Sequence, residues 1–217
     1  MPYIISIDPL HISPSSIEKA VTILKAGGIV AFPTETLYGL AADATNEKAV
    51  DCIFEIKGRS FNNPIALIIS KEDNLDLITD NIPEAAKKLM AAFWPGPLTL
   101  VFKASPSVSP HLTAGTGKIG VRISSHPIAH ALAAGLERAI TATSANLSGA
   151  RECTTAAEVI GQINSDLITI IDGGATPGGR GSTFLDVTSD PPAILREGMV
   201  TKASIKAVLT SDSFSRS

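Results

Sequence analysis

The chain has few aromatic residues and no excess of positive charge, and each shortage excludes a class of protein. Phe, Trp and Tyr make up 5% of its 217 residues, too few for a stacking platform that binds single-stranded nucleic acid. It has 18 Lys and Arg against 21 Asp and Glu, a formal net charge of −3. Proteins that wrap nucleic acid are usually basic. Any contact with nucleic acid is therefore expected to be local.

Cysteines and long hydrophobic runs are also scarce. Cys52 and Cys153 lie far apart and outside any Cys-x-x-Cys pair, which excludes a disulfide framework and fits a reducing compartment. The apolar stretches are broken by Gly, Pro or charge, well below the ~20 residues that cross a bilayer. No basic region precedes the short apolar run at the N-terminus, so a signal peptide is not expected. We predict a cytoplasmic protein that does not associate with membranes.

Hydrophobic residues are nonetheless abundant, at 44% of the chain, enough to bury a core. The length fits one domain, expected over residues 1–210 with a flexible tail at 211–217. Apolar periodicity and capping residues predict alternating elements. The expected helices are 15–26, 46–57, 83–93, 127–134, 155–163 and 202–209, and the expected strands are 29–32, 65–69, 98–102, 119–123, 140–143, 167–171, 183–188 and 193–196. This alternation favours a single-domain, open, twisted, mixed α/β sheet flanked by helices.

Three loops rich in small polar residues follow predicted strands, at 33–39, 144–149 and 172–182. In open α/β sheets, ligands bind in crevices where strands end and loops supply backbone N–H groups. The same residue types also form ordinary turns. One such loop is more simply a turn, whereas three in one chain leave open a concave ligand cleft built from them.

Several cations stand in unusual surroundings. Lys57 and Arg59 follow the helix at 46–57, where they either complement its C-terminus or form a polyphosphate site. Arg122 lies inside an apolar strand, so it needs an internal carboxylate or a ligand anion. Arg196 raises the same question, although a surface pair with Glu197 is an equal alternative.

Familiar catalytic motifs are absent. Gly174 and Gly179 have the glycine spacing of a P-loop, but the required Lys and Ser or Thr do not follow. No Gly-x-Ser-x-Gly nucleophile elbow occurs. His126 and His130 have the spacing of a zinc pair, yet no third ligand is evident. These observations argue against a Walker-type ATPase, an elbow hydrolase and a protein-held metal.

Short segments in a fixed order lie between about Ile17 and Gly198. They are ProThrGluThrLeuTyrGlyLeu (33–40), IleLysGlyArg (56–59), AsnPro (63–64), TrpProGlyProLeuThrLeu (94–100), ValArgIle (121–123), HisPro (126–127), SerAlaAsnLeuSerGly (144–149), AspGlyGly (172–174), SerThrPheLeuAsp (182–186) and ArgGluGly (196–198). In these segments the sequence resembles the threonylcarbamoyl-AMP synthases, which share the YrdC-like fold.

The resemblance implies a nucleotidyltransferase. L-threonine and bicarbonate (or CO2) would give a carbamate that attacks the α-phosphate of ATP, forming L-threonylcarbamoyl-AMP and pyrophosphate. The product would serve N6-threonylcarbamoylation of adenosine 37 in tRNA through downstream tRNA threonylcarbamoyl-transfer proteins. Mg2+ is expected only as the partner of the ATP phosphates.

The same resemblance assigns catalytic residues. The Lys-x-Arg and Ser-x-Asn motifs of the family fall on Lys57 and Arg59 and on Ser144 and Asn146. The cations would neutralise the phosphates and the charge on the departing pyrophosphate. The carbamate itself attacks, so no covalent nucleophile is needed and catalysis would rest on positioning.

Substrate-binding residues follow in the same way. Thr34, Arg122 and Ser182 would hold threonine, with Arg122 gripping its carboxylate bidentately. The nucleotide would be held by Lys57, Arg59, Ser144 and Arg196.

Two other functions stay open at this stage. One is an RNA-binding factor of the same fold that acts without catalysis, with at most a weak tRNA contact. The acidic net charge and the scarcity of aromatics count against it. The other is a carbamoyl-transfer enzyme using carbamoyl phosphate, but the larger proteins of that kind carry metal-binding cysteines that this chain lacks.

Overall fold

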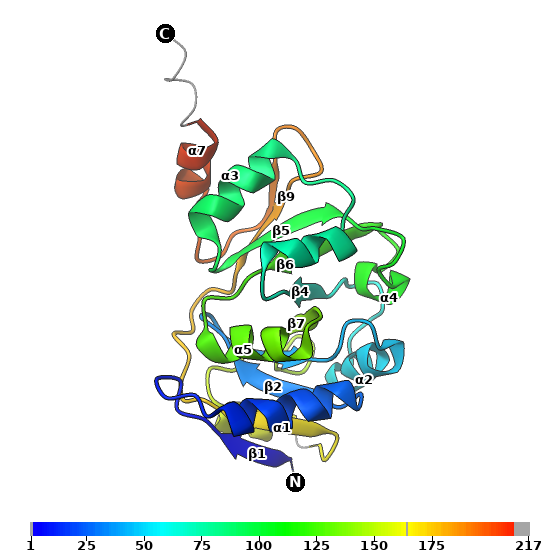
Figure 1. The fold of residues 1–217 in the computed structure, drawn as a ribbon, viewed down its shortest axis with the longest axis vertical. Helices are drawn as coiled ribbons and strands as arrows, with labels where there is room; N and C mark the ends of the chain where they lie inside the picture. The colour runs from blue at the N-terminus through cyan, green and yellow to red at the C-terminus, as the bar shows by residue number, and fades with distance from the viewer. Residues whose placement is uncertain (1, 164, 211–217) are drawn as a thin grey trace.

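The structure, a computed structural model, describes residues 2–163 and 165–210, so the expected tail at 211–217 lies outside it. Strands and helices alternate along the described chain (Figure 1). They are β1 (Tyr3–Ser6), α1 (Pro14–Lys25), β2 (Ile29–Pro33), β3 (Tyr38–Ala41), α2 (Glu47–Lys57), β4 (Ala66–Ile68), η1 (Glu72–Leu77), α3 (Glu84–Phe93), β5 (Leu98–Lys103), α4 (Pro110–Thr113), β6 (Lys118–Arg122), α5 (Pro127–Leu136), β7 (Ile140–Ser144), α6 (Ala156–Gln162), β8 (Ile168–Asp172), β9 (Thr183–Asp186), β10 (Ala193–Arg196) and α7 (Lys202–Thr210).

Within the described residues, ten strands form one sheet in the order β1-β8-β2-β3-β7-β4-β6-β5-β9-β10. Strand β8 pairs in parallel with both β1 and β2, as β4 does with β6 and β5 with β9. The remaining pairs are antiparallel. The expected mixed α/β sheet is therefore confirmed, and its strand order comes from the structure alone.

The strands are hydrophobic on both faces because helices cover both. Ile29 and Ala31 of β2 enter one core cluster, whereas Val30 and Phe32 enter the other, as the alternation of side chains along a strand requires. Helices α1 and α5 pack together on one face, and α2, α3, α6 and α7 contribute to the cluster on the opposite face. Continuous apolar strands are typical of such double coverage.

Two strands and the extent of one loop differ from expectation. The loop expected at 33–39 is a turn of only four residues, because Pro33 ends β2 and Tyr38 and Gly39 begin β3. Strand β3 has four buried residues without alternation, so its local pattern resembles the turn before it. Strand β1 is short and lies at the sheet edge, and η1 and α4 were also not expected. The strand expected at 183–188 ends at Asp186, whose carboxylate accepts hydrogen bonds from Thr188.

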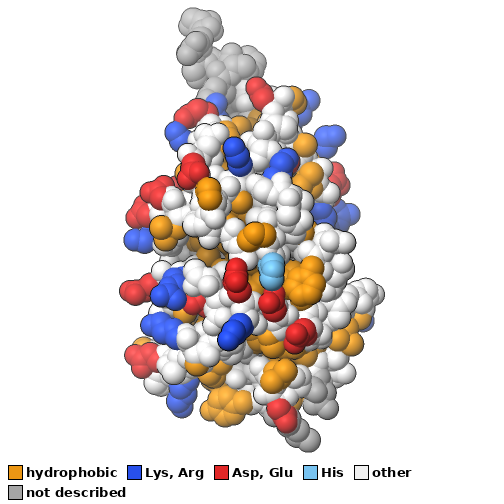
Figure 2. Space-filling model, turned by 90° about the vertical axis from the view of Figure 1, so that its right-hand side faces the viewer, with side chains coloured by type: hydrophobic (Ala, Val, Ile, Leu, Met, Phe, Trp, Pro, Cys, Tyr) orange, Lys and Arg blue, Asp and Glu red, His pale blue; other side chains and the backbone are white. Residues whose placement is uncertain are grey.

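The outer surface has a mixed charge on the face shown in Figure 2, where Lys and Arg are interspersed with Asp and Glu. No helix in residues 2–163 and 165–210 is long and apolar enough to cross a membrane.

The pairing of the central strands brings distant segments to one place. Gly39 of β3 lies opposite Ser144 of β7, and Ile68 of β4 lies opposite Arg122 of β6. On the outer side of β5, Thr99 lies opposite Phe184 of β9. The turn after β2, the ends of β6 and β7 and the start of β9 therefore surround one region near the middle of the sheet.

Candidate active site

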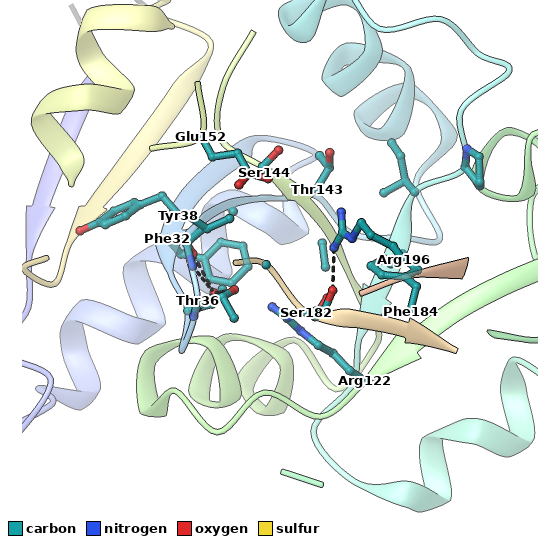
Figure 3. Close-up of a pocket in the computed structure, with 18 of the residues that line it drawn as sticks. Phe32, Thr36, Tyr38, Arg122, Thr143, Ser144, Glu152, Ser182, Phe184 and Arg196 are labelled. Atoms are coloured by element: carbon teal, nitrogen blue, oxygen red, sulfur yellow. Dashed lines mark hydrogen bonds between the residues drawn. The ribbon is translucent and has the colours of Figure 1, made fainter. Parts of the chain in front are cut away.

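That region contains a cavity with about 130 Å³ accessible to the centre of a water molecule. A single water needs roughly 10–15 Å³ on this measure, so the space suits a small molecule. Six of the residues expected to bind substrates line it: Thr34, Arg59, Arg122, Ser144, Ser182 and Arg196. In Figure 3, Arg122 and Thr36 lie at one end of the cavity, and Ser144 and Glu152 lie at the opposite end.

Arg122 is the most deeply buried cation of the cavity, with 6% of its surface exposed. Its Nη1 lies 3.4 Å from Oε1 of Glu35, which provides the internal carboxylate that the sequence suggested. The contact is loose, because the buried Nε of Arg122 and Oε1 of Glu35 both lack a hydrogen-bond partner. Burial lowers the pKa of Arg122, and the charge of Glu35 opposes that shift.

Arg59 and Arg196 bind neutral carbonyl groups instead. Arg59 donates from Nη2 to the carbonyl of Pro64 at 3.0 Å. Arg196 donates from Nη2 to the carbonyl of Ser182 at 2.9 Å, and its guanidinium lies 4.4 Å from the centroid of the Phe184 ring. These contacts replace the surface pair with Glu197 that the sequence allowed.

The guanidinium group of Arg196 is close enough to those of Arg59 and Arg122 for their like charges to repel. Burial, followed by the charge of Arg196, lowers the pKa of Arg59. Burial is also the main cause of the lowered pKa of Arg196, which Glu152 opposes and Arg122 reinforces. An anion between these groups would relieve both the repulsion and the unmet donors, so the cavity is suited to negatively charged ligands.

Lys57 and Asn146 do not line the cavity but hold one of its walls from behind. The buried Nζ of Lys57 donates to the carbonyl of Asn146 at 2.6 Å and to the carbonyl of Ser144. Burial, and then the charge of Arg59, lowers the pKa of Lys57 to about 8. Asn146 donates from Nδ2 to the carbonyl of Ala150 at 2.7 Å. The motif residues therefore fix the loop that carries Ser144.

Hydroxyl groups complete the lining. Thr34 donates from Oγ1 to the carbonyl of Leu37 at 2.7 Å and lies 3.0 Å from Oγ1 of Thr36. Ser182 lies 2.9 Å from Oγ1 of Thr99. These small residues place short donors and acceptors around the cavity without filling it.

Sequence reasoning missed several residues of the site. Glu35 lies within the Pro-Thr-Glu-Thr segment quoted from the sequence. Because Arg122 was expected to need an internal carboxylate, the only acidic residue of that segment was a candidate for its partner. Glu152 and Phe184 line the cavity with no local pattern to indicate it. Tyr38 donates to the carbonyl of Gly174 at 2.8 Å, and burial is the main reason that its pKa rises to about 12.

His, Cys, Asp and Glu side chains are the usual protein ligands of a resident metal ion. Across residues 2–163 and 165–210 there is no group of three or more His, Cys, Asp or Glu that could hold one. The single carboxylate among the cavity-lining residues of the described chain is that of Glu152. The described residues therefore offer one carboxylate at the cavity and no complete ligand set for a metal ion held by the protein alone.

The fold and the cavity together define a class, the α/β domains with a small cation-lined cavity where strands end. Within that class the chain belongs to the Sua5/YciO/YrdC family. The model of that family, described as telomere recombination, matches residues 22–198. The family resemblance expected from the short segments is thus confirmed.

Individual members of the family are similar to this chain in sequence and in structure. The threonylcarbamoyl-AMP synthase of Bacillus subtilis is 42% identical over 203 residues, which are 93% of this chain and 59% of that protein. The crystal structure of Pyrococcus abyssi Sua5 complexed with L-threonine superimposes with a TM-score of 0.92 at 41% identity, covering 94% of this chain and 60% of that one. The structure of Escherichia coli YciO gives a TM-score of 0.86 at 26% identity, covering 94% and 100%. The chain thus spans about three-fifths of the length of the first two.

Proposed function

We propose that this protein is an L-threonylcarbamoyladenylate synthase, a nucleotidyltransferase that uses ATP, L-threonine and bicarbonate. The observation that carries the proposal is the convergence of Arg59, Arg122 and Arg196 on one small hydroxyl-lined cavity. The substrates bring a carboxylate and a triphosphate, which are the anions that guanidinium groups bind best. The name of the Bacillus subtilis relative and the threonine complex of the Pyrococcus abyssi protein support the same activity.

L-threonine would lie at the Arg122 end of the cavity. The terminal nitrogen Nη1 of Arg122 lies 3.4 Å from Glu35 without a hydrogen bond, so the end of the guanidinium group can take the substrate carboxylate. Thr34 and Ser182 lie along the same lining and offer hydroxyl groups to the ammonium and side chain of the amino acid.

The nucleotide would lie toward Arg59, Arg196 and Ser144. Arg59 and Arg196 donate hydrogen bonds to neutral carbonyl groups. Neither forms an ion pair with a carboxylate within 4.0 Å in the described chain, so both can bind phosphate oxygens. Lys57 and Asn146 serve as positioning residues here, because their polar groups hold the backbone beside Ser144. Mg2+ bound to the phosphates would supply further charge neutralisation.

The reaction balances without a protein nucleophile. The ammonium group of threonine first loses a proton to solvent. Its amino nitrogen then bonds to the carbon of bicarbonate, and water leaves to give the carbamate. A carbamate oxygen then bonds to the α-phosphorus of ATP, while the bond from that phosphorus to the bridging oxygen breaks and pyrophosphate leaves. The arginines orient the two anions and neutralise the charge that gathers on pyrophosphate.

We expect the product to be used in the cytoplasm. There it would pass to proteins that transfer the threonylcarbamoyl group to adenosine 37 of tRNA. The alternative, a non-catalytic RNA-binding factor, is less favoured. The arginines described above line a cavity of small-molecule size, whereas the face in Figure 2 carries mixed charge and no basic stripe.

The test is pyrophosphate release by the purified protein with Mg2+ and ATP. We expect release only when L-threonine and bicarbonate are both present, with threonylcarbamoyl-AMP detected by mass spectrometry. Pyrophosphate release at the same rate with and without L-threonine would contradict the proposal. Release that requires carbamoyl phosphate instead of bicarbonate would favour the carbamoyl-transfer alternative.

A further inference from the structure

Glu35 is a largely enclosed carboxylate that contacts Arg122, one of the three arginines of the cavity. It follows β2 in the turn from which Thr34 and Thr36 face the cavity, while its own side chain, 12% exposed, contacts Arg122. Its second oxygen, Oε2, accepts a hydrogen bond from the hydroxyl of Ser124. Thr34 and Thr36 of this turn therefore line the cavity, while the carboxylate of Glu35 between them contacts Arg122.

The charges of the cavity are therefore distributed unevenly. Arg122 has a carboxylate partner at 3.4 Å, whereas Arg59 and Arg196 donate hydrogen bonds to the carbonyls of Pro64 and Ser182. Glu152 interacts with Arg196 through its charge, but Figure 3 places it at the opposite end from Arg122. One end of the cavity is close to neutral and the other is net positive.

We infer that Glu35 is a specificity-determining residue that reserves the Arg122 end of the cavity for the zwitterionic amino acid and keeps polyphosphate out of it. The inference rests on the proposed function. A carboxylate beside Arg122 weakens its attraction for an anion in proportion to the charge of that anion, so pyrophosphate loses far more than a monocarboxylate. The same carboxylate lowers the repulsion between Arg122 and the ammonium group of an amino acid.

Geometry preserves the recognition of the carboxylate. Because the pair with Glu35 involves Nη1 at 3.4 Å without a hydrogen bond, the terminal nitrogens of Arg122 stay unspent, whereas Nε is enclosed by the protein. A guanidinium recognises a carboxylate through two parallel donors. Glu35 thus cancels charge at Arg122 while leaving that pair of donors for the substrate.

The experiment is a calorimetric competition between L-threonine and inorganic pyrophosphate. In the wild-type protein, we expect saturating pyrophosphate to leave the Kd of L-threonine within about twofold. In Glu35→Gln, pyrophosphate should become a competitor that raises the apparent Kd of L-threonine ~10-fold or more, because a dianionic or trianionic ligand gains most from the lost carboxylate. Glu35→Asp, which keeps the charge, should retain most of the discrimination.

The matched control is Glu152→Gln, which removes the same charge from the other end of the cavity. Equal competition in Glu152→Gln and Glu35→Gln would overturn the inference, since the effect would then be one of general charge. Competition already present in the wild-type protein would overturn it too, even if Glu35→Gln fails to fold. Absence of any L-threonine binding to the wild-type protein would instead refute the proposed function.

Discussion

At the residue scale, Lys57 is a buried cation whose bonds go to the loop behind the cavity and not into the ligand space. Its ammonium group binds the carbonyls of Ser144 and Asn146, and burial lowers its pKa to about 8. An ammonium with 2% of its residue surface exposed loses most of its hydration on folding. Lys57 therefore links the stability of the fold to pH.

The expected pH dependence follows from the direction of that shift. The unfolded chain, with a lysine pKa near 10.4, binds more protons than the folded chain between pH 8 and pH 10. The contribution of Lys57 to the free energy of unfolding should thus rise with pH, by about 2 kcal/mol across this range. We expect the free energy of unfolding of the wild type minus that of Lys57→Met, measured by urea titration at each pH, to show this rise. The difference between the two proteins is the quantity to compare, because burial raises the pKa of Cys153 to about 11 and thereby lowers the stability of both proteins over the same range. A parallel pH dependence in both proteins would show that Lys57 titrates normally.

Arg122 leads to a second prediction at the same scale. Lysine keeps the charge but lacks the planar pair of donors, so Arg122→Lys should raise the Kd of L-threonine ~10-fold while leaving that of ATP within about twofold. Isothermal titration calorimetry measures both constants. The control is Arg138→Lys, because Arg138 pairs with Asp43 away from the cavity. Unchanged threonine affinity in Arg122→Lys would place the carboxylate elsewhere.

At the scale of elements, the segment after β10 contacts the start of β9 closely. A Cβ placed on Gly198 would lie 2.2 Å from the carbonyl oxygen of Gly181 and 2.5 Å from the carbonyl carbon of Ser182. The backbone N–H of Gly198 also donates to Oγ1 of Thr183 at 2.9 Å. Glycine is required here by the close approach of two backbones, and this approach places Ser182 at the cavity.

Gly198→Ala should therefore push the 181–182 segment toward the cavity and lower kcat/KM for L-threonine ~100-fold. The matched control is Gly161→Ala in α6, where a Cβ meets nothing within 4 Å. That control should keep full activity and gain up to about 1 kcal/mol of stability from helix propensity. Steady-state pyrophosphate release and thermal unfolding test both variants. Equal activity in the two would mean that the segment tolerates displacement.

At the scale of the whole molecule, the two hydrophobic clusters share the strands of one sheet. Alternate residues of β2 enter different clusters, so loss of packing on one face removes support from strands that the other face needs. This shared sheet should make the described chain unfold cooperatively, even though α1 and α5 lie on the face opposite α2 and α3.

Leu24→Ala tests that cooperativity. Leu24 is fully buried in the cluster of α1 and α5, and its truncation should cost about 3–5 kcal/mol. Trp94 lies in the other cluster, so its fluorescence should report the same lowered Tm as circular dichroism. Leu10→Ala, at an 85% exposed position, should leave the Tm unchanged. An unshifted Trp94 transition in Leu24→Ala would reveal two independent cores.

Much of the molecule could be predicted from local patterns. The helices at 14–25 and 47–57 follow from apolar spacing and from caps such as Asn46, whose side chain accepts a hydrogen bond from the N–H of Ala49. Strand β3 escaped prediction because four residues including a glycine acquire their structure from the strands that flank them. The family motifs indicated the region of the site, but Glu35 and Glu152 were assigned no role.

The sequence by itself determined the class of fold, the family and the set of cations, because periodicity, turn chemistry and motif order are local properties of the chain. Only the tertiary structure decided how those cations are used. It paired Arg122 with Glu35, left Arg59 and Arg196 on neutral carbonyls and turned Lys57 toward the loop of Ser144. The physical reason is that these partners are brought together by strand pairing across long stretches of chain, and several are backbone carbonyls, which every residue carries and no motif can mark.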